Sequence, residues 1–466
     1  MWKKVAAFLL AAAMCGSMFV GCNNNDGGNT STPDDGNQGG DSVATADPVT
    51  VKFWHINAED SDPTSIHQRL VSWAKDYSAN NPDNITVEMT GGKTADIVLT
   101  TLAGSSTPDV AHDYWNNIPA RADSGALLDI TDYINADTEW DLSDIPQAAL
   151  DRCYYNGRLY SVPFSMQSTY MYYRSDLLEE IGYDHAPETI EEMLDVIDKG
   201  TIVENGMIQR MGMIPDSPWR DDVLWTVQFG GTWIDPETNT ITCASDPNTV
   251  AAYQWQIDIM NKYGYQNIEN FKSSLGVRGE ATDWLIEGKV ILNWGGESLV
   301  NTYEEFAGDI PWGVTNMPYP ADRPELKGTG MVTVNVWEIN KKSEHPDQAW
   351  KALSNLTSKE NLIDFSGGQF NLGTFYARKS QLEYMRDEFE GSPALVDIAN
   401  VLLGDTLTGF PMSAYIGEYL AAFGNDMPAA WVGDCTAQEA LDKIAATIQP
   451  LADENPTIES QEDRKS

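Results

Sequence analysis

The chain has 466 residues, a net charge of −41 and 42% hydrophobic residues, which is the composition of a soluble globular protein. At about 150 residues per domain, this length predicts two lobes or more. A nucleic-acid partner is excluded by charge, because phosphate binding needs clustered Lys and Arg, whereas 29 basic residues here stand against 70 acidic ones.

The N-terminus has the residue order of a secretion signal. Two lysines precede an apolar run from residue 5 to residue 14, which is too short to remain as a membrane-spanning helix. We therefore predict that residues 1–21 are a signal peptide.

The sequence Phe-Val-Gly-Cys at the end of this signal resembles a bacterial lipobox, in which Cys22 is acylated and begins the mature protein. Phe19 stands where leucine is usual. Residues 22–47 are rich in Asn, Gly, Asp, Ser and Thr and are predicted to form a disordered tether. We expect a globular domain held at the outer face of the cell membrane through its N-terminal lipid only; the alternative is an ordinary signal peptide followed by an unmodified cysteine.

Three further cysteines follow, Cys153, Cys243 and Cys435. An odd number leaves at least one free thiol, and the spacing matches no metal site. They are interpreted as buried small side chains, or as one disulfide plus one thiol.

Strands and helices alternate after the tether, as hydrophobic periodicity indicates. The expected elements cover residues 49–54, 65–79, 85–89, 94–104 and 109–112. The order strand, helix, strand, helix, strand predicts a parallel sheet with right-handed crossovers. Ligands of such sheets lie beyond the carboxyl ends of the strands, so the loops at 55–60 and 113–117 are candidate ligand loops.

The stretch 156–174 predicts a crossing between two bodies. A turn at Asn156-Gly157 leads into a strand that is expected to end at Pro163. A polar break at 165–168 separates it from the aromatic run 170–173, which is expected to lie in a second sheet. This pattern suits a hinge beside a solvent-filled cleft. The alternative is one long bent strand in a single sheet.

The remaining elements are predicted from caps and periodicity. Helices are expected at 187–199, 219–229 and 247–263, strands at 211–214 and 290–294, a second crossing at 328–339, and several helices up to about residue 452.

Catalytic motifs are absent from the sequence. It contains no G-x-S-x-G, no H-E-x-x-H and no phosphate-binding glycine loop, and its five histidines show no ligand spacing. We therefore expect no enzyme, no metal and no cofactor, although an acid/base pair for glycoside cleavage is not excluded among 70 acidic residues.

Aromatic residues are the sequence's main chemical signal, with 15 tryptophans. Those near strand ends or glycine breaks are His55, Trp115, Trp219, Trp233, Trp294 and Trp337. Aromatic faces pack against the C–H faces of sugar rings, while neighbouring polar side chains pair with the hydroxyls. For any one tryptophan, core packing is the alternative.

A series of short motifs runs from residue 49 to about residue 454. It includes VTVKFWHI, TPDVAHDYWNN, NGRLYSVPFSMQSTYMYYR, WLIEGKVILNWGGESL and GFPMSAYIGEY. In this order the motifs resemble extracellular solute-binding proteins of family 1, the carbohydrate receptors of ATP-binding cassette importers. The resemblance implies an α/β, two-lobe periplasmic-binding-protein-like fold (type II), with a hinge and an interlobe ligand cleft. It also implies an N-terminal lobe of 48–164 plus 332–380, a C-terminal lobe of 165–331 plus 381–455, and a tail of 456–466.

Carried over by position, the resemblance implies ligand contacts in both lobes, at the hinge and in the late crossings. They are His55, Glu59, Asp113, Trp115, Asn116, Gln167, Trp219, Trp233, Trp294, Glu297, Tyr376 and Tyr415. Ile416 stands where maltodextrin receptors place a stacking tryptophan, and the aromatic residue of the 113–117 loop is displaced by about two positions. The resemblance therefore supports a sugar more than maltose in particular.

These expectations describe a monomeric, non-catalytic receptor that binds a carbohydrate, in oligosaccharide form, and delivers it to the permease of an importer. Two alternatives remain open. A surface-anchored glycan-degrading enzyme would need two carboxylates facing one sugar linkage. A receptor of the same fold for a polyamine, a metal or another non-sugar solute would hold a cation among acidic loops and aromatic rings.

Overall fold

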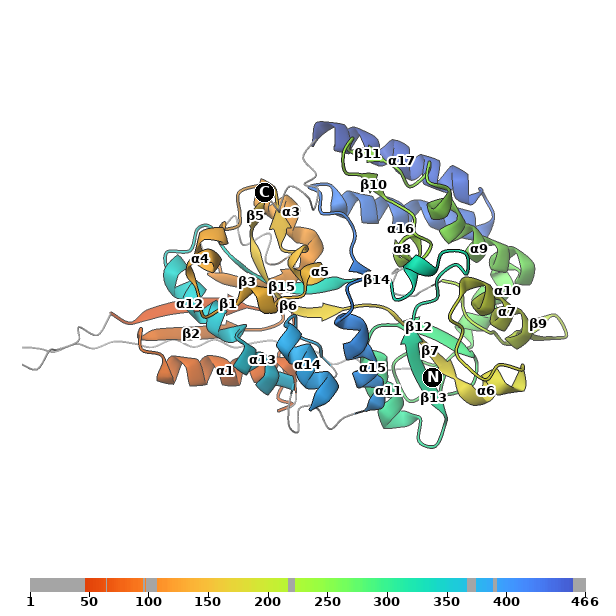
Figure 1. The fold of residues 1–466 in the computed structure, drawn as a ribbon, viewed down its shortest axis with the longest axis horizontal. Helices are drawn as coiled ribbons and strands as arrows, with labels where there is room; N and C mark the ends of the chain where they lie inside the picture. Colours follow the sequence, from red (N-terminus) through yellow and green to blue (C-terminus); the bar gives the residue numbers. More distant parts are fainter. Residues whose placement is uncertain are drawn as a thin grey trace, which may run out of the picture. The chain divides into compact units, whose positions relative to one another are not determined.

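The computed structural model describes residues 47–63, 65–94, 97, 107–216, 223–366, 374–388 and 392–455 (Figure 1). All of them belong to one compact unit, Ala46–Ser466. The predicted signal peptide, Cys22, almost all of the predicted tether, most of the helix predicted at 94–104, Trp219 and the predicted tail lie outside the described residues. None of the described helices combines the length and the hydropathy that crossing a membrane requires.

A five-stranded sheet has the strand order β2-β1-β3-β15-β6. Its strands are β1 (Val49–Trp54), β2 (Ile85–Thr90), β3 (Val110–Tyr114), β6 (Ser161–Gln167) and β15 (Thr333–Ile339). Both β2 and β3 pair with β1 in parallel, which confirms the predicted parallel sheet, whereas β15 is antiparallel to both β3 and β6.

Helix α1 (Ile66–Asn80) covers β2 with the amphipathic face that the sequence predicts (Figure 1). Ser65 caps it by accepting a hydrogen bond from the Gln68 backbone N–H at 3.1 Å. Buried Trp73 packs on Phe53 of β1 with ring centroids 5.7 Å apart. Helix α12 (Pro346–Leu356) contacts the same two strands, so this face of the sheet is closed by helices from distant parts of the chain.

A second, three-stranded sheet has the order β12-β7-β13, with both outer strands antiparallel to β7. Its strands are β7 (Tyr170–Arg174), β12 (Leu292–Gly295) and β13 (Trp312–Asn316). The helices α9 (Pro247–Tyr263), α16 (Ile416–Val432) and α17 (Ala437–Glu454) contact one another (Figure 1). Helix α9 has its predicted bounds, because Asp246 caps its start and Gly264, with φ +83°, ends it.

The chain passes from the first sheet to the second between Gln167 and Tyr170, as the aromatic runs predicted. The prediction that the strand ends at Pro163 was wrong. A register shift between Asn335 and Val336 places a bulge next to the proline, where the sheet tolerates the missing amide donor. The polar break is therefore shorter than 165–168, and Ser168 fastens the crossing by donating to the Met331 carbonyl at 3.1 Å.

Two other predictions were also wrong, and the start of a third element lies outside the described residues. Helix α7 (Ile190–Gly200) begins later than residue 187, because Thr189 forms a capping box with Glu192. The strand predicted at 211–214 is only an isolated bridge between Met211 and Val290. The helix predicted at 219–229 is described only as α8 (Leu224–Gln228).

The shorter strands form separate two-stranded pairs. They are β4 (Tyr154–Tyr155), β5 (Arg158–Leu159), β8 (Ile202–Glu204), β9 (Met207–Arg210), β10 (Ile234–Asp235), β11 (Thr240–Ile241), β14 (Gly330–Met331) and β16 (Leu407–Thr408). The remaining helices are η1 (Trp115–Asn117), α3 (Ile118–Asp123), α4 (Thr131–Ala136), η2 (Leu142–Asp144), α5 (Gln147–Leu150), α6 (Ser175–Glu180), α10 (Tyr265–Ser273), α11 (Ser298–Phe306), η4 (Pro324–Leu326), α13 (Lys359–Ser366), α14 (Lys379–Asp387) and α15 (Pro393–Leu402).

The three cysteines of the described chain are free thiols, with Cys153 and Cys243 buried and Cys435 half-buried. The alternative of one disulfide plus one thiol is therefore wrong. Burial raises the pKa of the Cys153 thiol to about 12, so this side chain behaves as a small apolar group.

Candidate functional site

The carboxyl ends of β1 and β3 lie at one edge of the first sheet, next to the crossing. Tyr114 at the end of β3 is paired with Asn335 of β15, and Thr333 of β15 is paired with Gln167 of β6. This edge therefore carries the loop after β1, the loop after β3 and the last residue before the crossing. Both predicted ligand loops reach it.

His55, directly after β1, is fully buried rather than open to solvent. Its Nε2 lies 3.1 Å from Nδ1 of His67, and burial, with His67 as the second cause, lowers the pKa of His55 to about 4. The ring is thus neutral at physiological pH. Glu59 in the same loop is exposed, and its Oε1 accepts a hydrogen bond from the Gly91 backbone N–H at 3.0 Å, which orders the loop against the end of β2.

Asp113 is held inside the fold by an ion pair with Arg121, which also pairs with Glu338 of β15. Asn117 adds a hydrogen bond to Asp113 Oδ1 at 2.9 Å. Burial raises the pKa of Asp113 above its ordinary value, and raises that of Glu338 to about 8, despite the guanidinium between them. Asp113 therefore anchors the loop after β3.

Tyr114 is the most exposed aromatic residue of that loop, at 45%, and the sequence analysis missed it as a site residue. The sequence carried no signal for it, because the four preceding residues of β3 are all buried and show no alternation between the two faces of the sheet. Asn116 next to it is half-buried. These two side chains present an aromatic face and an amide at the sheet edge.

Trp115 is 6% exposed and connects the first sheet to the late part of the chain. The Arg152 guanidinium lies 5.7 Å from its ring centroid and donates to the Phe410 carbonyl. The short helix η1, which begins at Trp115, also contacts α16. The loop after β3 therefore touches the chain that follows β16.

On the second sheet, Trp294 and Glu297 lie at the end of β12, beside the start of β7. Trp294 is 3% exposed, and its ring packs edge-on against Trp225 at 5.5 Å. Glu297 is 8% exposed, and burial raises the pKa of its carboxyl to about 7. Tyr172 of β7 donates to the Gly296 carbonyl at 2.8 Å, which fixes the turn that carries Glu297.

Three further predicted contacts are also buried, and their rings or hydroxyls already contact other groups. Trp233 is covered by the rings of Tyr253, Phe410, Tyr419 and Phe423. Tyr376 bridges to Ser165 and packs on Phe164 at 5.0 Å. Tyr415 donates its hydroxyl to Asn239 Oδ1 at 2.9 Å.

The fold agrees with comparisons to known proteins. A family model for bacterial extracellular solute-binding proteins matches residues 62–363, more than half of the chain. The chain belongs to this family.

Individual relatives of this solute-binding protein are distant. A lactose-binding protein of Rhizobium radiobacter is 26% identical over 230 residues, 47% of this chain and 50% of the relative, so the chain spans about half the length of this curated relative. The structure of CpMnBP1 with mannotriose bound superposes with a TM-score of 0.71 at 23% identity, covering 86% of this chain and 99% of that one. The sugar-binding protein MalE of Xanthomonas citri gives 0.69 at 18% identity, covering 87% and 98%. The solute-binding protein thus has the two-lobe α/β fold of these structures.

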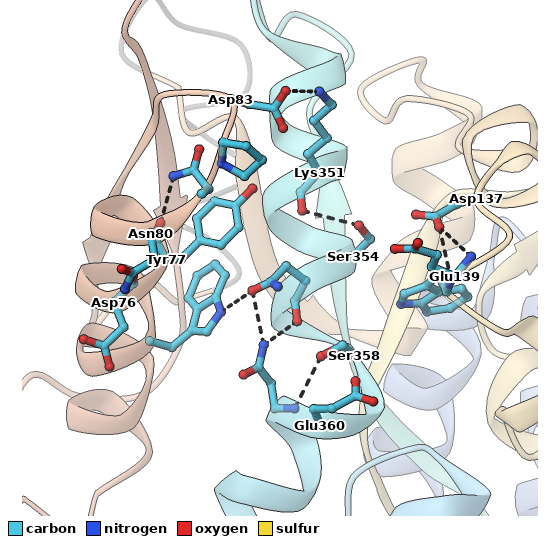
Figure 2. Close-up of a pocket in the computed structure, with 16 residues that line it drawn as sticks. Asp76, Tyr77, Asn80, Asp83, Asp137, Glu139, Lys351, Ser354, Ser358 and Glu360 are labelled. Carbon is cyan, nitrogen blue, oxygen red and sulfur yellow. Dashed lines mark hydrogen bonds and ion pairs between the residues drawn. The ribbon is translucent and has the colours of Figure 1, made fainter. Parts of the chain in front are cut away.

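A groove of about 720 Å³ lies elsewhere, between α1, α12 and the segment 137–140 (Figure 2). Figure 2 shows Tyr77 projecting from α1 toward the helix that carries Lys351 and Ser354. Polar groups that line the groove pair with each other. For example, Trp73 Nε1 donates a hydrogen bond to Asn355 Oδ1 at 3.0 Å. None of the predicted ligand residues that the structure describes lines this groove, so the solute-binding protein's candidate site remains at the two sheet edges.

Within the described ranges, no group of three His, Cys, Asp or Glu side chains is placed to hold a metal ion. His55 and His112 influence each other electrostatically, but they form no such group.

Proposed function

We propose that this solute-binding protein binds a carbohydrate, in oligosaccharide form, between its two lobes and delivers it intact to the permease of an ATP-binding cassette importer. The observation that carries the proposal is that the loop after β3, the last residue of β6 and the end of β12 all lie next to the crossing between the two sheets. Aromatic faces and hydrogen-bonding groups together match the two surfaces of a sugar ring.

The ligand contacts that we propose come from both sheet edges. Tyr114, Trp115 and Asn116 follow the first sheet, Gln167 ends β6, and Trp294 and Glu297 follow the second sheet. Trp219 remains a predicted contact. Trp233, Tyr376 and Tyr415 support the site from the core, because their ring faces or hydroxyls are already occupied.

The named relatives support a sugar as the ligand. One is a lactose-binding protein, another is a structure with mannotriose bound, and a third is called a sugar-binding protein. They differ among themselves in the sugar, so the proposal extends to the class of ligand and not to one member of it.

The proposed mechanism is closure of the two lobes around the ligand. A sugar that touches both sheet edges stabilises the closed arrangement by its differential affinity for the two states. The lobe boundaries predicted from the sequence, at 164–165, 331–332 and 380–381, remain part of this proposal. Small-angle scattering with and without saturating ligand measures the closure; identical curves would contradict it.

We also propose a monomer that is anchored to the outer face of the cell membrane by a lipid on Cys22. Cys22→Ala should release the protein from membranes into the soluble fraction, because it removes the proposed lipid and leaves a polar tether that does not insert into a membrane. Retention of the Cys22→Ala variant on membranes would refute the anchor.

The central test measures binding with two tryptophan variants. A panel that includes mannotriose, maltotriose and lactose is first screened by thermal unfolding, where a ligand at 100 times its Kd adds about 2.7 kcal/mol to stability. With the best ligand, Trp115→Ala and Trp294→Ala should each lose about 2 kcal/mol of binding energy, roughly thirtyfold in Kd.

The matched control is Trp431→Ala, which removes a half-buried tryptophan of α16 that donates to Gln256 at 3.1 Å. Far-UV circular dichroism confirms folding of all three variants. Equal Kd values for the three variants and the wild type would contradict the site. The bound oligosaccharide should be recovered without shorter products; cleavage that disappears on replacing one Asp or Glu would favour the glycan-degrading enzyme instead.

A further inference from the structure

Two buried polar groups lie near one another at the edge of the second sheet. Tyr170, the first residue of β7, is fully buried, and Glu297 is 8% exposed. Among the described residues, neither the Tyr170 hydroxyl nor Glu297 Oε2 has a hydrogen-bond partner. The charge of Glu297 acts on Tyr170 and is the second cause, after burial, that raises the tyrosine's pKa. Buried groups of this kind are rare in native structures unless something else pairs with them.

The pair lies at the crossing between the two sheets. Tyr170 is paired with Gly295 of β12 and Asn316 of β13, and it follows Ser168, which binds the Met331 carbonyl. Glu297 comes two residues after Gly295, at the start of α11. The pair therefore belongs to the end of the second sheet that the proposed ligand contacts.

The surrounding ionisable groups are committed to other partners. Tyr172 of β7 donates to the Gly296 carbonyl. Tyr303 of α11 lies 3.2 Å from an oxygen of Asp283, and Arg278 donates to the Trp294 carbonyl. Burial is the main cause that raises the pKa of Glu297, and its own backbone N–H opposes the shift.

We propose that Tyr170 and Glu297 form a subsite for one sugar hydroxyl, and that filling this subsite releases a proton from Glu297 to the solvent. The inference rests on the proposed function. A hydroxyl carries one donor and two acceptor positions, so it can donate to Glu297 Oε2 while it accepts from the Tyr170 hydroxyl. A charged acceptor makes the stronger bond, so the bound sugar favours the carboxylate over the carboxylic acid.

The proton release makes affinity depend on pH. With a pKa of about 7, Glu297 is ionised in about one tenth of the molecules at pH 6 and in most of them at pH 8. The apparent Kd equals the intrinsic Kd divided by the fraction of molecules in which Glu297 is ionised. Binding should therefore be about tenfold weaker at pH 6 than at pH 8.

Calorimetric titration with mannotriose, or with the best binder of the panel, tests the proposal at pH 6, 7 and 8 in two buffers of different ionisation enthalpy. The wild type should release most of a proton per bound ligand at pH 6 and very little at pH 8, and it should show the tenfold pH effect. Glu297→Gln should bind more weakly at pH 8 and lose the pH effect, whereas Tyr170→Phe should bind more weakly and keep it. Glu305→Gln, an exposed change on the same helix, should match the wild type.

A Kd of the wild type that is equal at pH 6 and pH 8, or a pH effect that survives in Glu297→Gln, would overturn the proposal. A ligand-free measurement separates this failure from that of the proposed function. Because the folded-state pKa of Glu297 is raised, the wild type should lose stability relative to Glu297→Gln as pH rises from 5 through 7 to 8. Parallel Tm curves would refute the subsite even if sugars bind, whereas absence of binding to the whole panel would refute the proposed function and the subsite with it.

Discussion

Replacing His112 by leucine should make the protein more resistant to acid. His112 of β3 is 2% exposed and lies between the rings of Trp337, at 4.7 Å, and Phe164, at 5.4 Å. Within the described residues neither ring nitrogen has a hydrogen-bond partner. Burial lowers the pKa of His112 to about 3, with the charge of His55 as the second cause.

The direction of the change in stability with pH follows from the proton binding of the folded and unfolded states. The unfolded chain binds a proton at each histidine below pH 6.5, whereas His112 and His55 stay neutral in the folded protein until about pH 3 and pH 4. Their contribution to stability is complete above pH 6.5 and is lost as pH falls below it. From 6.5 to 5 is about 1.5 pH units, so each histidine removes about 2 kcal/mol at pH 5.

Urea unfolding at pH 8 and pH 5 measures this loss, with tryptophan fluorescence and far-UV circular dichroism required to give coincident transitions. Between these pH values His112→Leu should lose about 2 kcal/mol less than the wild type. His185→Gln is the control, because its ring is half exposed and hydrogen-bonded to Asp184 at the surface. A pH dependence of His112→Leu within about 0.5 kcal/mol of the wild type would refute the reasoning.

Three further changes test the packing around the site. Arg121→Met should cost about 3–5 kcal/mol in urea unfolding, because it leaves Glu338 and the neighbouring aspartate buried without a cation; a loss below about 1 kcal/mol would show that the ion pairs are dispensable. Thr189→Ala should cost about 1 kcal/mol by removing the bond to the Glu192 backbone N–H, and an unchanged Tm would contradict the cap. Gly212→Ala should cost about 1–3 kcal/mol, because the added Cβ would clash with the backbone of α7, and wild-type thermal stability would contradict this.

Local signals in the sequence predicted the elements that carry their own caps. Helices α1 and α9 have the expected positions because Ser65 and Asp246 cap them and their apolar residues repeat at helical spacing. The crossing after β6 was predictable because a short polar segment separates two apolar runs. These features depend on residues a few positions apart.

Pairing between distant segments was not predictable in this way. The bulge that keeps Pro163 inside β6 depends on β15, about 170 positions further along the chain. The strand predicted at 211–214 is only a bridge for a similar reason, because Met211 pairs with Val290 in a separate segment of the chain.

The candidate site was predicted only in part, because burial is a property of the whole fold. Trp233 is expected from the sequence to face a ligand, yet Phe410 and Tyr419 cover its ring. Asp113 is expected from its position to contact the ligand, yet Arg121 bridges it to Glu338, 217 positions away from the arginine. The position of these residues in the sequence predicted that they lie at the ends of the two sheets. It did not predict which side chains are exposed to solvent and which are buried.

The pairing of β6 with β15 also restricts how the lobes can move. The two strands run antiparallel up to the crossing, where Thr333 is paired with Gln167, and the chain before β15 is paired again through β14 and β16. A two-stranded ribbon twists easily but resists bending within its own plane, where its hydrogen bonds would have to shear. The connection therefore restricts the relative motion of the lobes mainly to twisting. Any opening and closing of the lobes should follow one reproducible path.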